Sequence, residues 1–503
     1  MSLSALVLSF LSPIKAVSVS QLRALAGQTA VYGLSSIIGR LLNYLLVPLY
    51  TRIFSPADFG VVSEFYAYIT FLSVLYTYGM ETAFFHFVNR KPRHEQVYGH
   101  AQFLLLCTTL LFTVPLLLFA GPAAEALGYA SHPEYIRWIA LILAFDTLST
   151  LPFARLRQQN KAMRFAVIKL AGIFINIALN LYFLWYLPRA GSPLYNTGTG
   201  VGYVFLANLA ASALTWIMLF RETKEIRPGI SLQLLREMLI YSLPLLVAGF
   251  AGMINETLDR AILKYLISDP SIALEQLGIY SACYKLSIVM TLFVQTFRFA
   301  AEPFYFSRQH KEDSKRLFAA VMDYFVMAGC IIFLGIMFYL DVFKLFIGER
   351  YYGGLQVVPI LLAANLFLGI YLNLGIWYKL TGKTGYGAWL SVMGAVITIV
   401  LNLWLIPQFG IMGAAWATLI CYTLMMMLSY LKGRIEYPVP YHVPRIVGMM
   451  TITGLLWGGT AWMRSFYPLT DNHWWGINAF VLVAYFGVLW RFLGGKKQLP
   501  LFG

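Results

Sequence analysis

The sequence predicts an all-α polytopic membrane protein with about fourteen transmembrane helices. Three observations support this prediction. Of the 503 residues, 59% are hydrophobic and 12% are charged, a composition that soluble globular domains do not have. Apolar stretches of roughly 20 residues, the length that spans a bilayer, recur with short gaps between them. Lys and Arg residues concentrate in alternate gaps, as expected when only every second loop faces the cytoplasm.

The apolar stretches define the expected spans, and each ends where charged or turn-forming residues begin. Residues 1–26 precede the first stretch. They lack the basic start of a signal peptide, so we expect an interfacial or disordered lead. The spans are expected near residues 27–50, 60–88, 100–120, 135–153, 165–187, 200–220, 239–266, 278–304, 318–340, 356–378, 387–406, 413–431, 446–466 and 476–491.

The gaps between the spans orient the chain. Segments 89–93, 155–164 and 221–236 are rich in Lys and Arg, whereas 121–134 and 268–276 contain acids and no Lys or Arg. Basic loops stay in the cytoplasm, which also places both termini there, in the inner (cytoplasmic) membrane of the cell. This asymmetry explains the formal charge of +15, so no nucleic-acid partner is expected.

The two halves of the chain repeat each other. Three pairs of similar segments occur in the same order and at nearly the same separation: 59–63 with 277–281, 81–85 with 302–306, and 175–181 with 397–403. Each repeat holds an even number of spans, so both have the same orientation and are related by an axis along the membrane normal. We expect two six-helix lobes with the substrate site between them, followed by a C-terminal helix pair.

The repeat divides the chain into five parts. After a short lead, the two lobes follow each other and are joined by a cytoplasmic linker. The helix pair and a cytoplasmic tail end the chain. The expected parts are the lead 1–26, the N-lobe 27–220, the linker 221–238, the C-lobe 239–431 and the terminal part 432–503.

Cations inside the spans are the first candidates for a site. A cation at the bilayer centre costs about 2.5–3.5 kcal/mol on insertion scales, so it normally faces a partner or a watery cavity. In the first span, Arg40 shares a helix face with Asn43 and Tyr44 because spacings of three and four return to the same side. We expect this face to line a cavity; pairing of Arg40 with a neighbouring helix is the alternative.

The span at 239–266 carries a second polar cluster. Glu256 and Arg260 lie four residues apart, so one interpretation is an internal ion pair that only makes burial tolerable. The other is a carboxylate that binds a proton or Na⁺ beside a substrate-binding arginine. The cluster also contains Asn255 and Asp259.

The span at 278–304 places Gln295, Arg298 and Glu302 on one face, and the repeat mate of Glu302 is Glu81. Both glutamates lie toward the cytoplasm and could instead pair with loop arginines. Other cations within the spans have long side chains that can reach the interface. Lys285 is interpreted either as facing the cavity or as reaching the interface, and the second interpretation is favoured for Arg137, Lys169, Lys264 and Arg464.

No catalytic or nucleotide-binding motif accompanies these groups. Residues 381–384 resemble the end of a phosphate-binding loop, but Trp377 stands where that motif needs glycine. The seven histidines and four cysteines show no metal-ligand spacing. We therefore expect a transporter rather than an enzyme, without a cofactor and driven by an H⁺ or Na⁺ gradient or by the membrane potential.

Several segments resemble bacterial polysaccharide-biosynthesis membrane proteins. Residues 29–52 look like the first helix of that family, 78–83 match a further motif, and 401–418 are similar to its late repeat. These proteins are lipid-linked oligosaccharide flippases, in the superfamily that also holds multidrug exporters and peptidoglycan-precursor flippases. The resemblance covers the chain from about residue 20 to residue 435.

The resemblance implies a function and roles for the candidate residues. Such a flippase moves an undecaprenyl-diphosphate-linked oligosaccharide to the outer leaflet during synthesis of O-antigen, capsule or exopolysaccharide. Its partners would be the lipid-linked glycan, membrane lipids, and the glycosyltransferases and polymerase of the same pathway. Arginine suits diphosphate oxygens, and amides and hydroxyls suit a glycan. The implied roles are diphosphate binding by Arg40, Arg260 and Arg298, glycan binding by Asn43, Tyr44, Asn255 and Gln295, and ion coupling or charge balance by Glu81, Glu256, Asp259 and Glu302.

Other functions stay open at this point. Fourteen helices would resemble the peptidoglycan-precursor branch of the superfamily. A multidrug or cation antiporter on the same fold would prefer a cavity of carboxylates and aromatic rings, which the arginines argue against. A membrane polymerase or ligase would need a sizeable outer loop with a catalytic cluster, and the expected outer loops are short. A scaffold for glycosyltransferases is a further alternative.

Overall fold

The computed structural model is helical, and its described residues contain no strand. This confirms the predicted all-α membrane fold. The expected lead at 1–26 and Arg40 both lie outside the described residues. The residues described are 38–39, 41–88, 94–193, 195–223, 231–308, 313–467 and 470–494.

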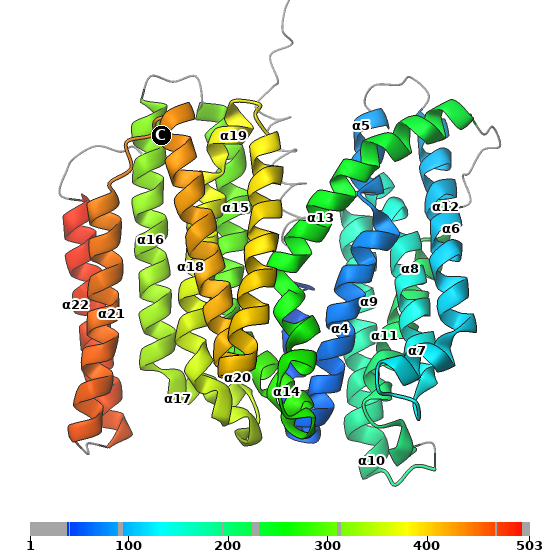
Figure 1. Cartoon of the computed structure of the whole chain (residues 1–503), viewed down its shortest axis with the longest axis horizontal. Helices are drawn as coiled ribbons and strands as arrows, with labels where there is room; N and C mark the ends of the chain where they lie inside the picture. The colour runs from blue at the N-terminus through cyan, green and yellow to red at the C-terminus, as the bar shows by residue number, and fades with distance from the viewer. Residues whose placement is uncertain are drawn as a thin grey trace, which may run out of the picture.

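Figure 1 shows two helical bundles side by side, with a pair of helices at the outer edge of the second bundle. The first bundle, the N-lobe, comprises α3 (Leu46–Ile53), α4 (Pro56–Thr77), α5 (Met80–Val88), α6 (His94–Leu118), α7 (Ala120–Ala126), α8 (Pro133–Gln158), α9 (Ala162–Leu181) with its π-helical and α10 extensions (Tyr182–Tyr186, Leu187–Arg189), α11 (Gly202–Met218) and α12 (Phe220–Thr223).

The second bundle, the C-lobe, repeats this arrangement and carries the helix pair. It begins with α13, which connects the two bundles in Figure 1. The C-lobe comprises α13 (Leu232–Leu266), α14 (Pro270–Leu286), α15 (Ile288–Arg308), α16 (Ser314–Phe338), α17 (Leu340–Phe343), the 3₁₀ segments Lys344–Phe346 and Glu349–Val357, α18 (Val358–Leu374), α19 (Ile376–Leu380) and α20 (Gly385–Glu436), and the pair is α21 (Val443–Phe466) and α22 (Asp471–Gly494).

Ten helices in the described chain are long and apolar enough to cross a membrane, or up to eleven if the bent pair α14–α15 forms one span. The helix α20 has 52 residues and contains a kink at Gly410, where φ is +54°. A straight helix of that length would measure about 78 Å, more than twice the bilayer core. This length fits the two spans expected at 387–406 and 413–431, while the total of fourteen stays a prediction.

Local sequence signals explain where α4 begins and ends. The Ser55 side chain accepts a hydrogen bond from the Asp58 backbone N–H, and the Asp58 carboxylate accepts one from Ser55, which forms a capping box in front of Pro56. The helix ends at Tyr78 and Gly79, which both have positive φ. The span expected at 60–88 is therefore broken into α4 and α5.

The two lobes approach most closely where α4 crosses α14. A Cβ atom on Gly60 would lie 2.0 Å from the carbonyl oxygen of Leu274, and one on Gly278 would lie 1.9 Å from that of Pro56. Any side chain larger than hydrogen would separate the helices. Gly60 and Gly278 are equivalent positions in the sequence repeat, so the axis that relates the lobes passes between them. We call this end of the molecule the closed end.

The opposite end of the bundles is rich in basic residues, and we call it the basic end. It lies at the top of Figure 1, where α8, α13, α16 and α20 have the termini that the sequence predicts to be cytoplasmic. Its described Lys and Arg residues include Arg155, Arg157, Arg236, Lys315, Arg316, Lys432 and Arg434.

The helix α13 belongs to both lobes. Leu234, Leu235 and Met238 near its start pack into a buried cluster with residues of α5, α6 and α8. Further along, the Asn255 side chain donates a hydrogen bond to the Ser391 carbonyl of α20 (3.0 Å). The helix thus leaves the N-lobe at the basic end and reaches the C-lobe at mid-depth. Pro244, Gly249 and Gly252 lie between these attachments.

We predict that Gly60→Ala will weaken the closed end. Overpacking of this kind costs about 1–3 kcal/mol, so the equilibrium ratio of closed to open molecules should fall roughly 5- to 150-fold. The test uses Ser63→Cys, whose side chain lines a cavity on the far side of the α4–α14 crossing. An impermeant maleimide is applied from the closed-end side, and the rate at which it labels this cysteine is measured. The variants are made in a protein that carries Cys107→Ser, which removes the one exposed native thiol of the described chain.

The matched control is Gly121→Ala in α7, because a Cβ atom there meets no atom within 4 Å. This variant should label at the parental rate. Faster labelling in both variants, or in neither, would contradict the role assigned to the crossing.

Candidate functional site

A cavity of about 470 Å³ lies between the lobes, beyond the α4–α14 crossing. Its wall is formed by α3 and the helical residues before it, α4, α13, α14 and α15, with one residue each from α9 and α11. The charged side chains among its described lining residues are Glu256, Arg260 and Lys285. We call this space the central cavity. Cations placed at this depth fit the prediction that charge inside the spans faces a polar space.

Arg260 is held by its own helix and by α14. Its guanidinium bonds the Asp259 carboxylate (3.4 Å) and the Glu256 backbone carbonyl, and it lies 4.4 Å from the centre of the Tyr284 ring. The other Asp259 oxygen accepts a hydrogen bond from the Tyr280 hydroxyl (2.6 Å). The carboxylate partner of Arg260 is therefore Asp259 and not, as one interpretation had it, Glu256, whose side chain is exposed in the cavity.

Lys285 provides the second cation of the central cavity. Its ammonium lies 5.3 Å from the centre of the Tyr44 ring. Asn43 and Gln295 line the same cavity, so the structure brings together four predicted substrate-binding residues with Lys285 and with the predicted coupling residue Glu256. These four are Asn43, Tyr44, Arg260 and Gln295.

A second cavity, of about 490 Å³, lies within the N-lobe and is lined by α5, α8, α9 and α11. We call it the N-lobe cavity. It shares three lining residues with the central cavity, namely Asn43, Asn176 and Asn208, so the two spaces meet there. Lys169 lines this cavity, although the sequence favoured an interfacial position for it. The carboxylate of Asp146 lies near Lys169 and Ser212.

Two equivalent ion pairs lie toward the basic end, one in each lobe. Glu81 of α5 pairs with Arg157 of α8, and Glu302 of α15 pairs with Lys379 of α19 (2.5 Å). Glu302 also bonds Arg298 (2.8 Å), whose side chain is half exposed. Both glutamates therefore have basic partners, which was the alternative interpretation. Arg298 lies outside the lining of the central cavity.

Asn255 and Asp259 also lie outside the lining of the central cavity. The Asn255 amide bonds the Ser391 carbonyl (3.0 Å), and its oxygen accepts a hydrogen bond from the Thr398 hydroxyl (3.1 Å). Asp259 is 4% exposed and contacts Arg260 and Tyr280. Asn255 thus holds α13 against α20, and Asp259 orients the cavity arginine.

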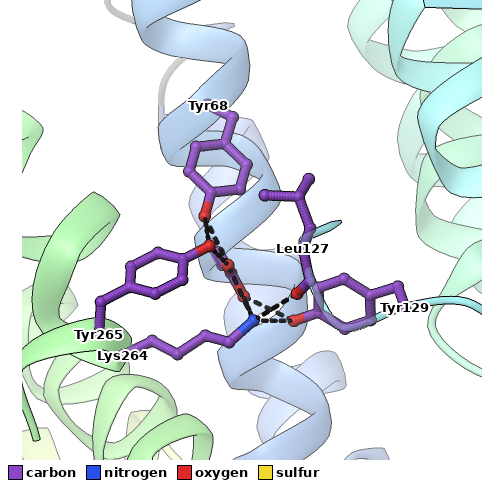
Figure 2. Close-up of polar contacts among 6 residues, drawn as sticks. Tyr68, Leu127, Tyr129, Lys264 and Tyr265 are labelled. Carbon is purple, nitrogen blue, oxygen red and sulfur yellow. Dashed lines mark hydrogen bonds and ion pairs between the residues drawn. The ribbon is translucent and has the colours of Figure 1, made fainter. Parts of the chain in front are cut away.

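A buried carboxylate joins the lobes near the closed end. Glu64 of α4 is fully buried and accepts hydrogen bonds from the hydroxyls of Tyr68 (2.6 Å) and Tyr129 (2.5 Å). The Lys264 ammonium of α13 lies 3.1 Å from the same carboxylate and donates to the Leu127 carbonyl (2.9 Å). Figure 2 shows these side chains converging from three segments of the chain. The expectation that Lys264 reaches the membrane interface is therefore wrong.

Further hydrogen bonds close this end. The Tyr351 hydroxyl of the C-lobe donates to the carbonyls of Phe54 and Ser55 in the N-lobe (3.1 Å each). The Arg52 guanidinium donates to the Leu345 carbonyl (2.9 Å). With the helix crossing and the Glu64–Lys264 pair, these contacts separate the central cavity from the closed-end surface.

Sequence reasoning missed Glu64 and Asp146. Both are acids within apolar stretches, and an acid at bilayer depth needs a partner or a polar space as much as a cation does. The same argument that selected Arg40 and Arg260 would have selected them.

Residues 25–309, more than half of the chain, match the family described as "Polysaccharide biosynthesis protein". The chain is 19% identical over 467 residues to a probable low-salt glycan biosynthesis flippase, Agl15, of Haloferax volcanii, covering 91% of this chain and 92% of the relative. It is 21% identical over 413 residues to the capsular polysaccharide biosynthesis protein CapF of Staphylococcus aureus, covering 79% and 96%.

Solved structures share the fold. The lipid II flippase MurJ in an inward closed conformation aligns with a TM-score of 0.73 and 11% identity, over 92% of this chain and 98% of that one. An inward-facing multidrug transporter of the MATE family aligns with a TM-score of 0.64 and 14% identity, over 82% and 96%. At these identities the likeness concerns the fold alone.

We predict that the Glu64–Lys264 pair stabilises the described arrangement. Glu64→Gln leaves a buried ammonium without its charge partner, and Lys264→Met leaves a buried carboxylate without one. Each change should cost about 3–5 kcal/mol, seen as a lower midpoint of thermal unfolding in detergent. The double variant should lose clearly less than the sum of the single losses, because no unpaired charge remains.

The matched control is Asp313→Asn, which removes a carboxylate from a fully solvated pair with Arg316. Such a pair contributes little, so the midpoint should not move. Strictly additive losses at Glu64 and Lys264 would show that the two side chains are not coupled.

Proposed function

The chain belongs to the polysaccharide biosynthesis protein family, and from this we propose that it is a flippase that carries a lipid-linked glycan across the membrane. Two relatives that it matches over most of their length are named for glycan flipping and for capsule synthesis. The substrate we propose is an undecaprenyl-diphosphate-linked oligosaccharide for a cell-surface polysaccharide.

One observation carries this proposal: two cations of the central cavity, Arg260 and Lys285, lie at mid-depth between the lobes. A diphosphate is a compact dianion that needs such partners away from water. The guanidinium offers a planar fork for phosphate oxygens, and the ammonium offers a mobile point charge. Asp259 and Tyr284 fix the orientation of Arg260 before any substrate arrives, which lowers the cost of binding.

The direction of transport follows from the asymmetry of the two ends. The positive-inside rule places the basic end in the cytoplasm, together with both termini. In the described arrangement the closed end is sealed by the Gly60–Gly278 crossing and by Glu64–Lys264. This state is suited to accept a substrate from the cytoplasmic leaflet of the inner membrane. Rocking of the lobes would then release the glycan on the other side while its polyprenyl chain stays in lipid.

We propose that an H⁺ or Na⁺ gradient or the membrane potential drives this cycle. Glu256 is the better candidate for coupling, because its side chain is exposed in the central cavity one turn from Arg260. Asp259 is engaged by Arg260 and Tyr280, and its loss would disturb substrate binding instead.

The proposed function is tested by deletion in the native host. The deletion strain should accumulate a lipid-linked oligosaccharide on the inner leaflet and lose its surface polysaccharide. Arg260→Gln should restore less than a tenth of the polysaccharide, because a neutral amide cannot bind a diphosphate in this way. The matched control is Arg316→Gln, which removes a solvated cation at the basic end and should restore the full amount.

Full restoration by Arg260→Gln would remove this arginine from the site. An unchanged glycan profile in the deletion strain, together with new sensitivity to cationic drugs, would replace the flippase by a multidrug exporter.

We predict that Glu256→Gln will reduce the dependence of transport on ion gradients. In inverted membrane vesicles, a protonophore or a Na⁺ ionophore should slow the parent severalfold and the variant much less, since the variant has lost its ionisable group. Glu349→Gln is the matched control, because Glu349 is exposed at the closed end and should leave the ionophore response unchanged. An identical response in Glu256→Gln and the parent would clear Glu256 of coupling.

A further inference from the structure

The N-lobe cavity has an equivalent place in the C-lobe that is filled by side chains, and the sequence repeat shows which residues fill it. A Cβ atom on Gly172 would lie 2.3 Å from the Thr215 hydroxyl, and one on Gly394 would lie 2.5 Å from the Met425 sulfur. Gly172 and Gly394 are equivalent in the repeat, so Thr215 corresponds to Met425. The helix positions agree and the side chains differ.

The same comparison extends to the neighbouring positions. Ser212, one turn before Thr215, corresponds to Tyr422, and Tyr422 and Met425 are each only 2% exposed. The Tyr422 hydroxyl donates to the Asn255 carbonyl (3.0 Å), so its ring is held between α13 and α20. Large side chains thus occupy in the C-lobe the positions that small hydroxyl side chains hold around the N-lobe cavity.

Two turns of the backbone support this correspondence independently. Asn160 follows α8 with φ +56°, and Gly382 follows α19 with φ +71°. Both positions come three residues after the basic partner of the equivalent ion pairs, Arg157 and Lys379. The two lobes therefore agree in these backbone turns and differ in the residue types around the N-lobe cavity.

The lining of the N-lobe cavity matches the chemistry of a sugar. Its uncharged polar side chains are amides and hydroxyls, which donate and accept the hydrogen bonds that vicinal hydroxyls and acetamido groups require. Polar side chains at membrane depth cost free energy unless they bind a partner or face a polar space. The volume of about 490 Å³ lies within the usual range of small-molecule sites. The amides are Asn43, Asn176 and Asn208, and the hydroxyls belong to Ser149, Thr150, Ser212 and Thr215.

The charges differ between the two cavities. The described lining of the central cavity contains two cations and one carboxylate, and that of the N-lobe cavity contains two of each. Glu81 pairs with Arg157, and Lys169 lies near Asp146. A diphosphate is favoured in the central cavity, and an uncharged, hydroxyl-rich group is favoured in the N-lobe cavity.

We propose that the N-lobe cavity is a saccharide subsite that takes a neutral part of the cargo while the central cavity holds its diphosphate. This rests on the proposed function. The two cavities meet at Asn43, Asn176 and Asn208, so these amides would contact the sugar next to the diphosphate. The sugars that are further from the diphosphate would lie against α8 and α11.

The test compares two single cysteines in the Cys107→Ser background. Thr150→Cys reports on the N-lobe cavity, and Ser63→Cys reports on the central cavity. The labelling rate by an impermeant maleimide is measured in inverted membrane vesicles with two probes. Farnesyl diphosphate has no sugar, and the second probe is the lipid-linked glycan extracted from the deletion strain.

Farnesyl diphosphate should slow the labelling of Ser63→Cys at least fivefold and leave Thr150→Cys unchanged, whereas the lipid-linked glycan should slow both. Protection of Ser63→Cys alone by the glycan would overturn the saccharide subsite and leave the flippase function standing. No protection of either cysteine by either probe would overturn the flippase function and the subsite with it.

A second variant checks that the cavity itself is needed. Ser212→Tyr introduces the side chain that the C-lobe uses at the equivalent position. It should abolish the protection of Thr150→Cys by the glycan and lower transport at least tenfold, while farnesyl diphosphate still protects Ser63→Cys. The matched control is Leu214→Tyr, an exposed position on the same helix, which should change neither. Undiminished transport in Ser212→Tyr would overturn the proposal.

Discussion

One close approach between two helix backbones determines where the lobes meet. At Gly60 and Gly278 the carbonyl of the opposite helix occupies the space that a Cβ atom would need. Because only glycine fits there, α4 and α14 cross at the symmetry axis and bring Glu64 within reach of Lys264. The cavities extend from this seal toward the basic end. The seal therefore sets the depth of the site and the side from which it is entered.

The two lobes share a scaffold and differ in chemistry. The equivalent ion pairs Glu81–Arg157 and Glu302–Lys379 fix corresponding helices in each lobe. Around the N-lobe cavity the side chains are small and polar, whereas Tyr422 and Met425 fill the corresponding place in the C-lobe. A duplicated fold can thus keep its packing where the lobes move and change residue types where a ligand would bind. Because the backbones of the two lobes correspond, these differences can be assigned to individual side chains.

Much of the fold and part of the site could be predicted from the sequence. Helical periodicity places Asn43 and Tyr44 on one face, and the cost of a membrane cation points to Arg260; both arguments are local and hold in the structure. The contacts of Asn255 with α20 and of Arg298 with Glu302 depend on which helices are neighbours, which periodicity cannot tell. Lys264 was misjudged because its partner, Glu64, is 200 residues away in the chain.

The helix α13 has a mechanical consequence. Its beginning is packed into the N-lobe and its middle is bonded to α20, so the lobes cannot tilt as free bodies. Any change in their angle must be absorbed as curvature of this one rod, over the stretch that holds Pro244, Gly249 and Gly252, where a helix bends most readily. In the proposed rocking of the lobes, this helix would store elastic energy as it bends, and its stiffness would limit how far and how fast the lobes can tilt.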